Sequence, residues 1–262
     1  MTAGQGSAGE GPPSAGRSVV VTGGAGGIGR AICTAFAALG DRVALVHRPD
    51  SRDRAGAVLS GLPGDGHAAV AGDLATAAGA RKLAADAAAA LGGIDVLVNN
   101  AGAGIAHPPL TTDPEEWAAA WEQVLAVNLL GPVNLTHAAL PFLRESSAPR
   151  VVNVSSRGAF RGEPDMPAYG ASKAALNSFT QSMALALGPV GIAVSAVAPG
   201  FVDTGMARWE SGPAERRDAI RAQSPLNRVA RADEVADAVV YLAGAEWATG
   251  SILDLNGASY LR

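Results

Sequence analysis

The sequence has a single cysteine, no long apolar run and no strong excess of charge, and each absence excludes a class of protein. Because Cys33 is the one cysteine among 262 residues, no disulfide can form within the chain, and a reducing, cytoplasmic setting is expected. No run of about 18 apolar residues is present to span a bilayer. A net charge of −4 gives no overall attraction to nucleic acid or to an acidic membrane. We therefore expect neither to be a partner.

The sequence also lacks a metal-binding pattern. His107 and His137 could act as acid/base groups, but nothing pairs them with further ligands at the spacing that a zinc site requires. No bound metal is expected.

The N-terminal segment differs in composition from the rest of the chain. Residues 1–17 are dominated by Gly, Ser, Ala and Pro, and no apolar segment follows a basic start. They are expected to form a flexible tail without a catalytic role. Residues 18–262 have the length of one large α/β domain with a buried core.

From residue 18 onward, short apolar runs alternate with helical stretches. Continuous runs such as Val19–Val21 and Val96–Val98 are typical of strands buried on both faces. Strands that alternate with helices predict a doubly wound parallel sheet, whose ligands bind beyond the carboxyl ends of the strands. The seven expected strands are 18–22, 42–47, 67–72, 94–99, 150–155, 192–198 and 251–255. The expected helices are 27–39, 75–91, about 113–142, 167–187 and 232–243.

A glycine-rich loop follows the first expected strand. Backbone without Cβ atoms can turn tightly and approach a pyrophosphate, whose charge is favoured at the N-terminus of the next helix. The loop therefore predicts a dinucleotide site. Two glycine frames fit it, one with GxGxxG spacing and one with GxxxGxG spacing: Gly24, Gly26 and Gly29, or Gly23, Gly27 and Gly29.

The end of the second expected strand bears on which nucleotide binds. An acidic residue there would favour NAD(H), whereas this strand ends in His47 and Arg48, and Arg48 offers a planar fork for a 2′-phosphate. Asp50 argues the other way, but it follows Pro49 and is expected to lie outside the strand. We favour NADP(H), and NAD(H) remains open.

The chain carries a candidate acid/base group in Tyr169, four residues before Lys173. Residues at i and i+4 share a helix face, so the lysine can stabilise a phenolate that would otherwise form only near pH 10. Thirteen residues earlier, Ser156 stands directly after the fifth expected strand, where its hydroxyl can donate to a substrate oxygen.

These motifs, in this order, resemble the short-chain dehydrogenase/reductase family in its single-domain form, including its 3-oxoacyl-ACP reductase-like members. The resemblance covers residues 17–257 and implies a Rossmann fold with helices on both faces of a seven-stranded sheet. The other matching stretches are Asp73-Leu74, Asn99–Gly102, Asn128 and Pro199-Gly200 with Thr204.

The resemblance also implies a role for each matching residue. Ser156 polarises a carbonyl, Tyr169 transfers the proton, Lys173 holds the nicotinamide ribose and lowers the tyrosine pKa, and Asn128 supports a water-linked proton relay. The implied cofactor-binding set is Gly23, Gly27, Ile28, Gly29, Arg48, Asp73, Leu74, Asn100, Ala101, Gly102, Tyr169, Lys173, Pro199, Gly200, Val202 and Thr204. Asp73 meets the adenine, residues 100–102 lie along the adenosine ribose, and residues 199–204 flank the nicotinamide.

Two positions depart from the family pattern, and one proline adds a local expectation. Gly26 stands where NADP-preferring relatives often have a basic residue, and Ala258 stands where relatives often have a second glycine. Pro132 has no N–H for the carbonyl of Asn128, four residues earlier, so we predict a kink that leaves this carbonyl free for a water. The alternative is that Pro132 only starts a new helical segment.

The expected activity is hydride transfer between NADP(H) and a ketone/secondary alcohol pair. The resemblance also implies that residues 201–228 form a lid over the substrate. Two other functions stay open: reduction of a 3-oxoacyl thioester and non-catalytic nucleotide sensing. Arginines such as Arg157 and Arg161 could bind a carrier or coenzyme A phosphate, or could simply be solvated at the surface. By resemblance a homotetramer is expected, with a dimer as second choice.

Overall fold

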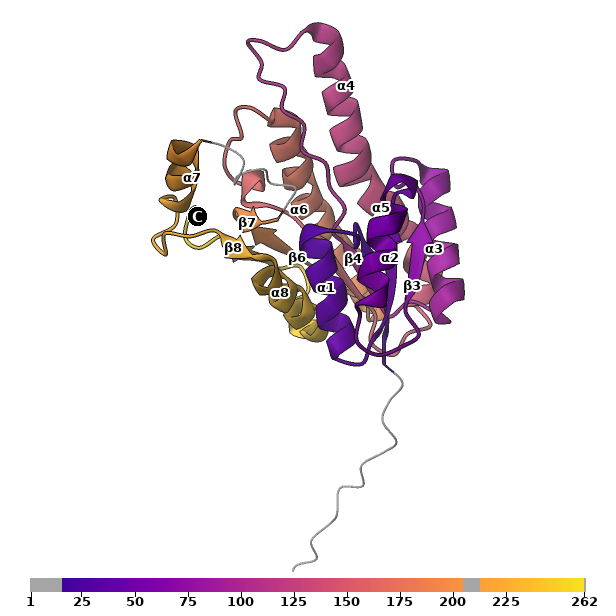
Figure 1. Cartoon of the computed structure of the whole chain (residues 1–262). Coiled ribbons are helices and arrows are strands. Elements are labelled where there is room, and N and C mark those ends of the chain that lie inside the picture. The colour runs from indigo at the N-terminus through magenta and orange to yellow at the C-terminus, as the bar shows by residue number, and fades with distance from the viewer. Residues whose placement is uncertain (1–15, 205–212, 262) are drawn as a thin grey trace, which may run out of the picture.

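A computed structural model of the chain describes residues 16–204 and 213–261, and it places seven parallel strands in one sheet (Figure 1). The strand order is β3-β2-β1-β4-β5-β6-β9, which reverses direction beside β1 as in a doubly wound fold. The strands are β1 Ser18–Thr22, β2 Arg42–His47, β3 Ala68–Ala71, β4 Val96–Asn99, β5 Arg150–Val154, β6 Ala193–Pro199 and β9 Ile252–Leu255. The predicted fold class is confirmed.

Helices cover both faces of this sheet. On one face α1 packs against α8, and on the other α3 packs against α5. The helices are α1 Gly27–Ala38, α2 Arg52–Ser60, α3 Ala77–Leu91, α4 Pro114–Leu125, α5 Gly131–Leu143, α6 Pro167–Leu187, α7 Ala214–Arg221 and α8 Ala232–Gly244. A short two-stranded pair, β7 Val202–Asp203 with β8 Ala230–Arg231, lies apart from the main sheet. Figure 1 shows α7 beside this pair and outside the three layers.

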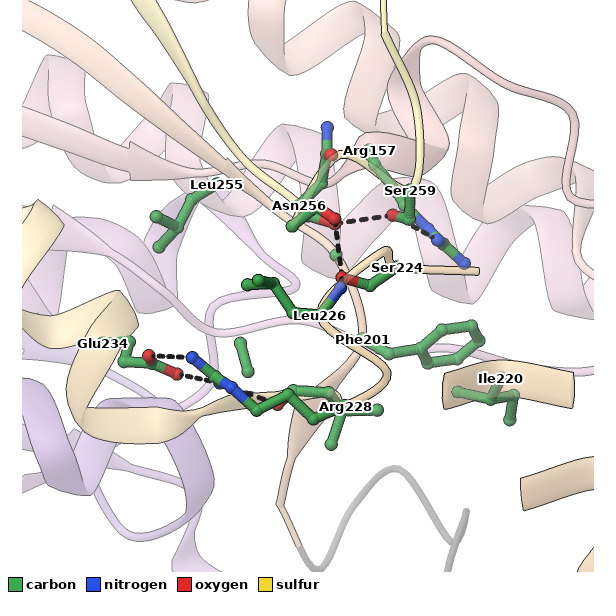
Figure 2. A pocket seen from close by; sticks show the side chains of 14 residues that line it. Arg157, Phe201, Ile220, Ser224, Leu226, Arg228, Glu234, Leu255, Asn256 and Ser259 are labelled. Carbon is green, nitrogen blue, oxygen red and sulfur yellow. Dashed lines mark hydrogen bonds and ion pairs between the residues drawn. The ribbon is translucent and has the colours of Figure 1, made fainter. Parts of the chain in front are cut away.

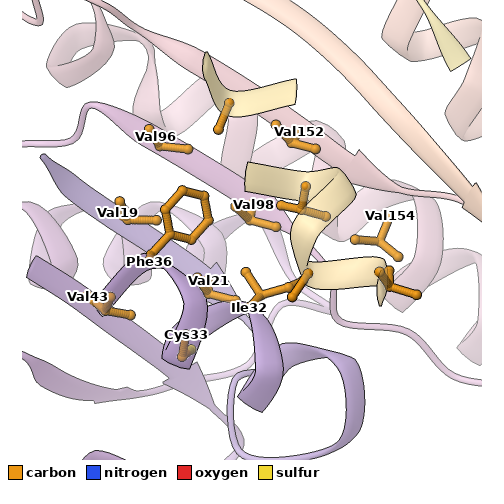
Figure 3. Packing of buried hydrophobic residues seen from close by; sticks show 14 of the residues in the cluster. Val19, Val21, Ile32, Cys33, Phe36, Val43, Val96, Val98, Val152 and Val154 are labelled. Carbon is orange, nitrogen blue, oxygen red and sulfur yellow. The ribbon is translucent and has the colours of Figure 1, made fainter. Parts of the chain in front are cut away.

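The alternation of side chains along each strand divides the core in two. Val19 and Val21 of β1 point to the α1/α8 side, where they pack with Phe36 (Figure 3), whereas Val20 points to the α3/α5 side with Leu97. A strand that is apolar at every position can bury both faces in this way. The two half-cores hold the strand ends, and therefore the site, in fixed positions.

The helix starts follow from local chemistry. Asp113 caps α4 by accepting a hydrogen bond from the backbone N–H of Glu116 at 2.9 Å, and Pro114 occupies the first helical position. At the end of α1, Gly40 adopts a φ of +84°, a left-handed conformation suited to glycine. These helix ends lie within one residue of the expected ones, at residue 39 and at about residue 113.

Between α4 and α5, residues Ala126–Leu130 form a π-helical turn. The N–H of Gly131 reaches back five residues to the carbonyl of Ala126. The helix is therefore distorted just before Pro132, as the predicted kink requires. The helix α5 starts at Gly131, one residue before Pro132, which agrees with the alternative that Pro132 starts a new helical segment. A free Asn128 carbonyl stays a prediction.

One helical stretch, Pro114–Leu143, is long and apolar enough to cross a membrane by length and composition alone, with a mean hydropathy of 1.2 over its most apolar window. Its α5 part packs against α3, and its α4 part packs against α6. Core helices of α/β domains pass the same test, and these contacts place the stretch within the domain.

Two expectations fall partly outside the described residues. Residues 1–15 of the expected tail, and residues 205–212 of the expected lid, are not described. On either side of the second gap, β7 and α7 belong to the expected lid.

Candidate active site

The glycine loop after β1 favours one of the two frames. Gly23 and Gly27 have φ angles of +67° and +52°, which side chains rarely adopt. A Cβ on Gly29 would lie 2.2 Å from the carbonyl oxygen of Gly23, so no other residue fits there. Gly26, by contrast, is extended with nothing within 4 Å of its Cβ position. Gly24 is constrained as well, because its Cβ would lie 2.6 Å from Leu45 Cγ. All three glycines of the GxxxGxG frame are therefore constrained, whereas the GxGxxG frame includes the unconstrained Gly26.

A hydroxyl at the end of β1 holds this loop against the end of β4. Thr22 Oγ1 accepts hydrogen bonds from the backbone N–H groups of Asn100 and Ala101, both at 2.9 Å. The Asn100 side-chain amide donates in turn to the carbonyl of Thr22 at 2.8 Å. The segment expected along the adenosine ribose is thus fixed beside the segment expected at the pyrophosphate.

The end of β2 holds an ion pair that the sequence reasoning did not anticipate. Asp50 lies in a 3-10 turn just beyond the strand, as expected, but its carboxylate accepts a hydrogen bond from Arg48 at 2.8 Å. Ser51 Oγ also donates to Asp50, and Arg54 donates to Ser51 Oγ. Arg48 and Asp50 are both exposed, so a ribose 2′-substituent can reach either.

Asp73 and Leu74 follow β3 at the same edge of the sheet. Asp73 is exposed, and its carboxylate accepts a hydrogen bond from the N–H of Ala75 at 2.9 Å, while Leu74 packs against the α3/α5 core. The contact of Asp73 with the adenine stays a prediction.

Asn128 lies fully buried in the π-helical turn and holds a neighbouring loop. Its side chain accepts from the N–H of Ala103 at 2.7 Å and donates to the Ala103 carbonyl at 2.9 Å. It also donates to Ser172 Oγ of α6 at 3.1 Å. The Asn128 side chain therefore holds the loop at Ala103 and the helix α6 in position. A Cβ on Gly102 would lie 3.6 Å from Asn128 Oδ1 and 3.7 Å from Lys173 Nζ, which places Gly102 beside both residues.

Three of the four candidate catalytic side chains meet where the turn after β5 packs against α6. Ser156 follows β5, and its Oγ accepts from the N–H of Gly158 at 3.0 Å. Tyr169 and Lys173 share one face of α6, with Lys173 Nζ 5.8 Å from the centre of the Tyr169 ring. Lys173 is buried and donates to the carbonyl of Val154 at 2.9 Å.

Burial dominates the electrostatics of this group. Burial raises the pKa of Tyr169 above its usual value of 10, and the charge of Glu163 raises it further, while a hydrogen bond with Ser156 opposes the rise. Burial also lowers the pKa of Lys173 to about 8. Desolvation therefore sets the direction of the shift in the tyrosine pKa, and a lowering of this pKa by Lys173 stays a prediction.

Residues at the end of β6 complete this edge. Pro199 pairs with Leu255 of β9, and the N–H of Gly200 donates to the Leu255 carbonyl at 3.0 Å. Val202 begins β7, and the side chain of Thr204 lies 3.2 Å from the Cβ position of Gly27. The expected nicotinamide end thus reaches back to the glycine loop. Ile28 packs against the α1/α8 core.

Two residues have roles that the sequence did not reveal. His107 is buried, with Nδ1 hydrogen-bonded to the Ile105 carbonyl and Nε2 accepting from the N–H of Ala168, so it anchors the start of α6. Arg157 is only 4% exposed, so it is not the solvated surface arginine that one of the two expectations described. Its position next to Ser156 is the one sequence feature that could have singled it out.

The arrangement suits a nicotinamide dinucleotide. Glycines in left-handed conformations leave the turn after β1 free of side chains. Arg48 and Asp50 lie exposed just after β2, and the buried Lys173 lies beside Tyr169. Within residues 16–204 and 213–261, no group of three or more His, Cys, Asp or Glu side chains could hold a metal ion.

Comparisons with known proteins agree with this geometry. A family model described as short chain dehydrogenase matches residues 17–213, so the chain belongs to the short-chain dehydrogenase/reductase family and is an oxidoreductase. An uncharacterised short-chain type dehydrogenase/reductase of Sinorhizobium fredii is 39% identical over 246 residues, which are 92% of this chain and 43% of that protein. The acetoacetyl-CoA reductase of Rhizobium meliloti is 35% identical over 257 residues, 93% of this chain and 98% of that protein.

A solved structure is also similar. The crystal structure of a short chain dehydrogenase from Burkholderia cenocepacia in complex with NADP has a TM-score of 0.82 and 34% identity, and the match covers 93% of this chain and 97% of that one.

Proposed function

We propose that the protein transfers a hydride between NADP(H) and a ketone/secondary alcohol pair, as a carbonyl reductase or alcohol dehydrogenase. The observation that carries this proposal is the meeting of Ser156, Tyr169 and Lys173 at one edge of the sheet, with Asn128 holding the adjoining loop. A sensor of nucleotides would need no such set of side chains.

The chemistry follows from the properties of each group. A bound nicotinamide supplies or accepts the hydride. Ser156 Oγ donates to the substrate oxygen as negative charge develops on it. Because the raised pKa keeps Tyr169 protonated at neutral pH, its hydroxyl is ready to donate a proton to the new alkoxide.

The opposite direction requires Tyr169 to lose its proton first. We therefore expect alcohol oxidation to speed up toward alkaline pH, whereas carbonyl reduction proceeds at neutral pH. At a pH below its pKa of about 8, Lys173 carries the positive charge that favours the phenolate. The protonation of Lys173 and that of Tyr169 are therefore coupled.

For the cofactor, Arg48 supports NADP(H), and the Asp50 carboxylate paired with it keeps NAD(H) in consideration. The related Burkholderia cenocepacia structure contains NADP. We expect Asp50→Asn to free Arg48 and to raise the preference for NADPH over NADH by about fivefold, as an exposed charge pair allows. Binding titrations with both reduced cofactors measure this preference, and an unchanged ratio would argue against Arg48 as the 2′-phosphate ligand.

The second candidate function is reduction of a 3-oxoacyl thioester, which the similarity to an acetoacetyl-CoA reductase favours. Oxidation of NADPH in the presence of ketones or of acetoacetyl thioesters separates the two functions. Turnover of thioesters with a kcat/KM far above that of plain ketones would make the second function the better one. Turnover of neither class, despite binding of NADPH, would favour the sensor.

We further propose one domain over residues 18–262, a cytoplasmic location and a homotetramer, with a dimer as second choice. The outward face of α6 supports association, because it carries small residues together with Leu185, which is 82% exposed. Light scattering tests the oligomer, and a monomeric mass would contradict it. Neither nucleic acid nor a membrane is a proposed partner; the proposed substrate is a small molecule.

A further inference from the structure

Beneath α7 the structure has a cavity of about 140 Å³ beside the predicted nicotinamide end. Its walls come from the turn after Ser156, the segment between β6 and β7, the end of α7 with the segment that follows it, and the C-terminal segment (Figure 2). Two arginines, Arg157 and Arg228, lie on opposite sides of it. Their environments differ in a way that points to a ligand.

Arg228 is fully paired. It donates to both carboxylate oxygens of Glu234, at 2.8 and 2.7 Å. This contact lowers the pKa of Glu234 to about 2. The charge of Arg228 is thus neutralised by a fork-to-fork contact, and nothing further is needed to stabilise it.

Arg157 has only neutral partners. It donates to Ser259 Oγ at 2.6 Å and to Gln223 Oε1 at 2.7 Å, and its guanidinium lies 4.6 Å from the centre of the Phe201 ring. Across the described ranges, no Asp or Glu oxygen lies within 4 Å of it. These bonds use two of its five N–H groups.

A buried arginine without an acidic partner is unusual, because an unpaired charge is costly to remove from water. At 4% exposure, Arg157 is among the most enclosed charged groups described. Burial lowers its pKa, and the nearby charge of Arg161 lowers it further, against a smaller opposing effect of Glu163. An anion in the cavity would remove this cost.

We propose that the cavity is a subsite for a carboxylate carried by the substrate, with Arg157 as the cation that determines specificity for it. This inference rests on the proposed function. Arg157 directly follows Ser156 in the chain, and Gly200, at the predicted nicotinamide end, lines the same cavity. A substrate at the predicted nicotinamide end can extend an acidic group past Gly200 toward this arginine.

The size and the walls of the cavity narrow the substrate class. Its volume of about 140 Å³ is close to that of a cavity that holds six heavy atoms, such as benzene. That is room for a carboxylate with two or three carbons, and too little for the phosphates of coenzyme A. Among the other lining residues, Ile220, Leu226 and Leu255 offer apolar contacts for methylene groups. A short oxo acid or hydroxy acid fits both features.

The test uses pairs of substrates that differ only in charge. The acids are 3-oxobutanoate, 4-oxopentanoate and 5-oxohexanoate, and each is compared with its methyl ester by NADPH oxidation. The measured quantity is the ratio of kcat/KM for acid over ester. Because both members of a pair are assayed on one preparation, the ratio does not depend on the fraction of folded enzyme.

We expect the wild type to prefer at least one acid over its ester, and Arg157→Gln to lower that ratio by about 10- to 100-fold, as loss of a charge-assisted contact would. The side-chain amide introduced by this substitution can still bond to neutral neighbours. Arg161→Gln is the matched control, since it removes a nearby positive charge that does not line the cavity. It should change the ratio by less than about threefold.

Three outcomes would overturn the inference. The wild type turns over esters without preferring any acid, the Arg161 variant lowers the ratio as much as the Arg157 variant does, or Arg157→Gln lowers the kcat/KM of acetoacetyl-CoA as strongly as that of the acids. The last result would assign the anion to coenzyme A. Absence of turnover on acids and esters alike would instead contradict the proposed function itself.

Discussion

Replacement of Thr22 by valine removes a hydroxyl that ties two cofactor-binding segments together while keeping the shape of the side chain. Thr22 is 1% exposed, and its Oγ1 accepts from the N–H groups of Asn100 and Ala101. Each N–H left without an acceptor costs about 1–1.5 kcal/mol at a partly buried position. The variant should lose about 2–3 kcal/mol of unfolding free energy, or roughly 4–12 °C in Tm for a domain of this size.

The control is Thr22→Ser, which keeps the hydroxyl and removes one methyl group, at a cost of about 1 kcal/mol. Urea unfolding of the three proteins gives the two differences directly. Titration with NADPH should also show weaker binding to the valine variant than to the serine variant, because residues 100–102 lose their anchor. A valine variant at least as stable as the serine variant would refute the reasoning.

Three further predictions concern single positions. Ala258 has a φ of +57°, so Ala258→Gly should stabilise the fold by about 1 kcal/mol in urea unfolding; a loss of stability would contradict the strain. Gly26→Lys adds a cation into open space and should strengthen NADPH binding relative to NADH by about fivefold in parallel titrations; an equal effect on both cofactors would count against it. Because the pKa of Lys173 falls from 10.5 to about 8 on folding, the unfolded chain binds more protons between these values, and the stability of wild type relative to Lys173→Met should rise with pH across that window; a fall would contradict the burial argument.

The fold could be predicted from sequence because its strands are buried on both faces. β1 and β2 begin and end at the expected residues, as does α6. The helix α2, Arg52–Ser60, was not predicted, since it buries only Ala55 and contains Gly56, so it has no apolar stripe to show. The pair β7 and β8 has two residues in each strand, too few for any periodic pattern.

The features of the site that depend on side-chain identity and backbone geometry were predictable, and those that depend on tertiary packing were less so. The spacing of Tyr169 and Lys173 fixes their common helix face, and the glycine frame follows from the left-handed φ angles of Gly23 and Gly27. The direction of the tyrosine pKa shift depends on burial, which the spacing does not contain. The same holds for Arg157, whose enclosure comes from segments distant in sequence.

The most direct test of the account is NADPH oxidation by wild type and by Tyr169→Phe against a panel of ketones and oxo acids. The phenylalanine variant keeps the ring and its packing and loses only the hydroxyl that transfers the proton. The account predicts turnover by the wild type and a loss of about 100-fold or more in kcat for the variant, with binding of NADPH retained. Equal turnover by the two proteins would contradict the assignment of Tyr169 as the acid/base group.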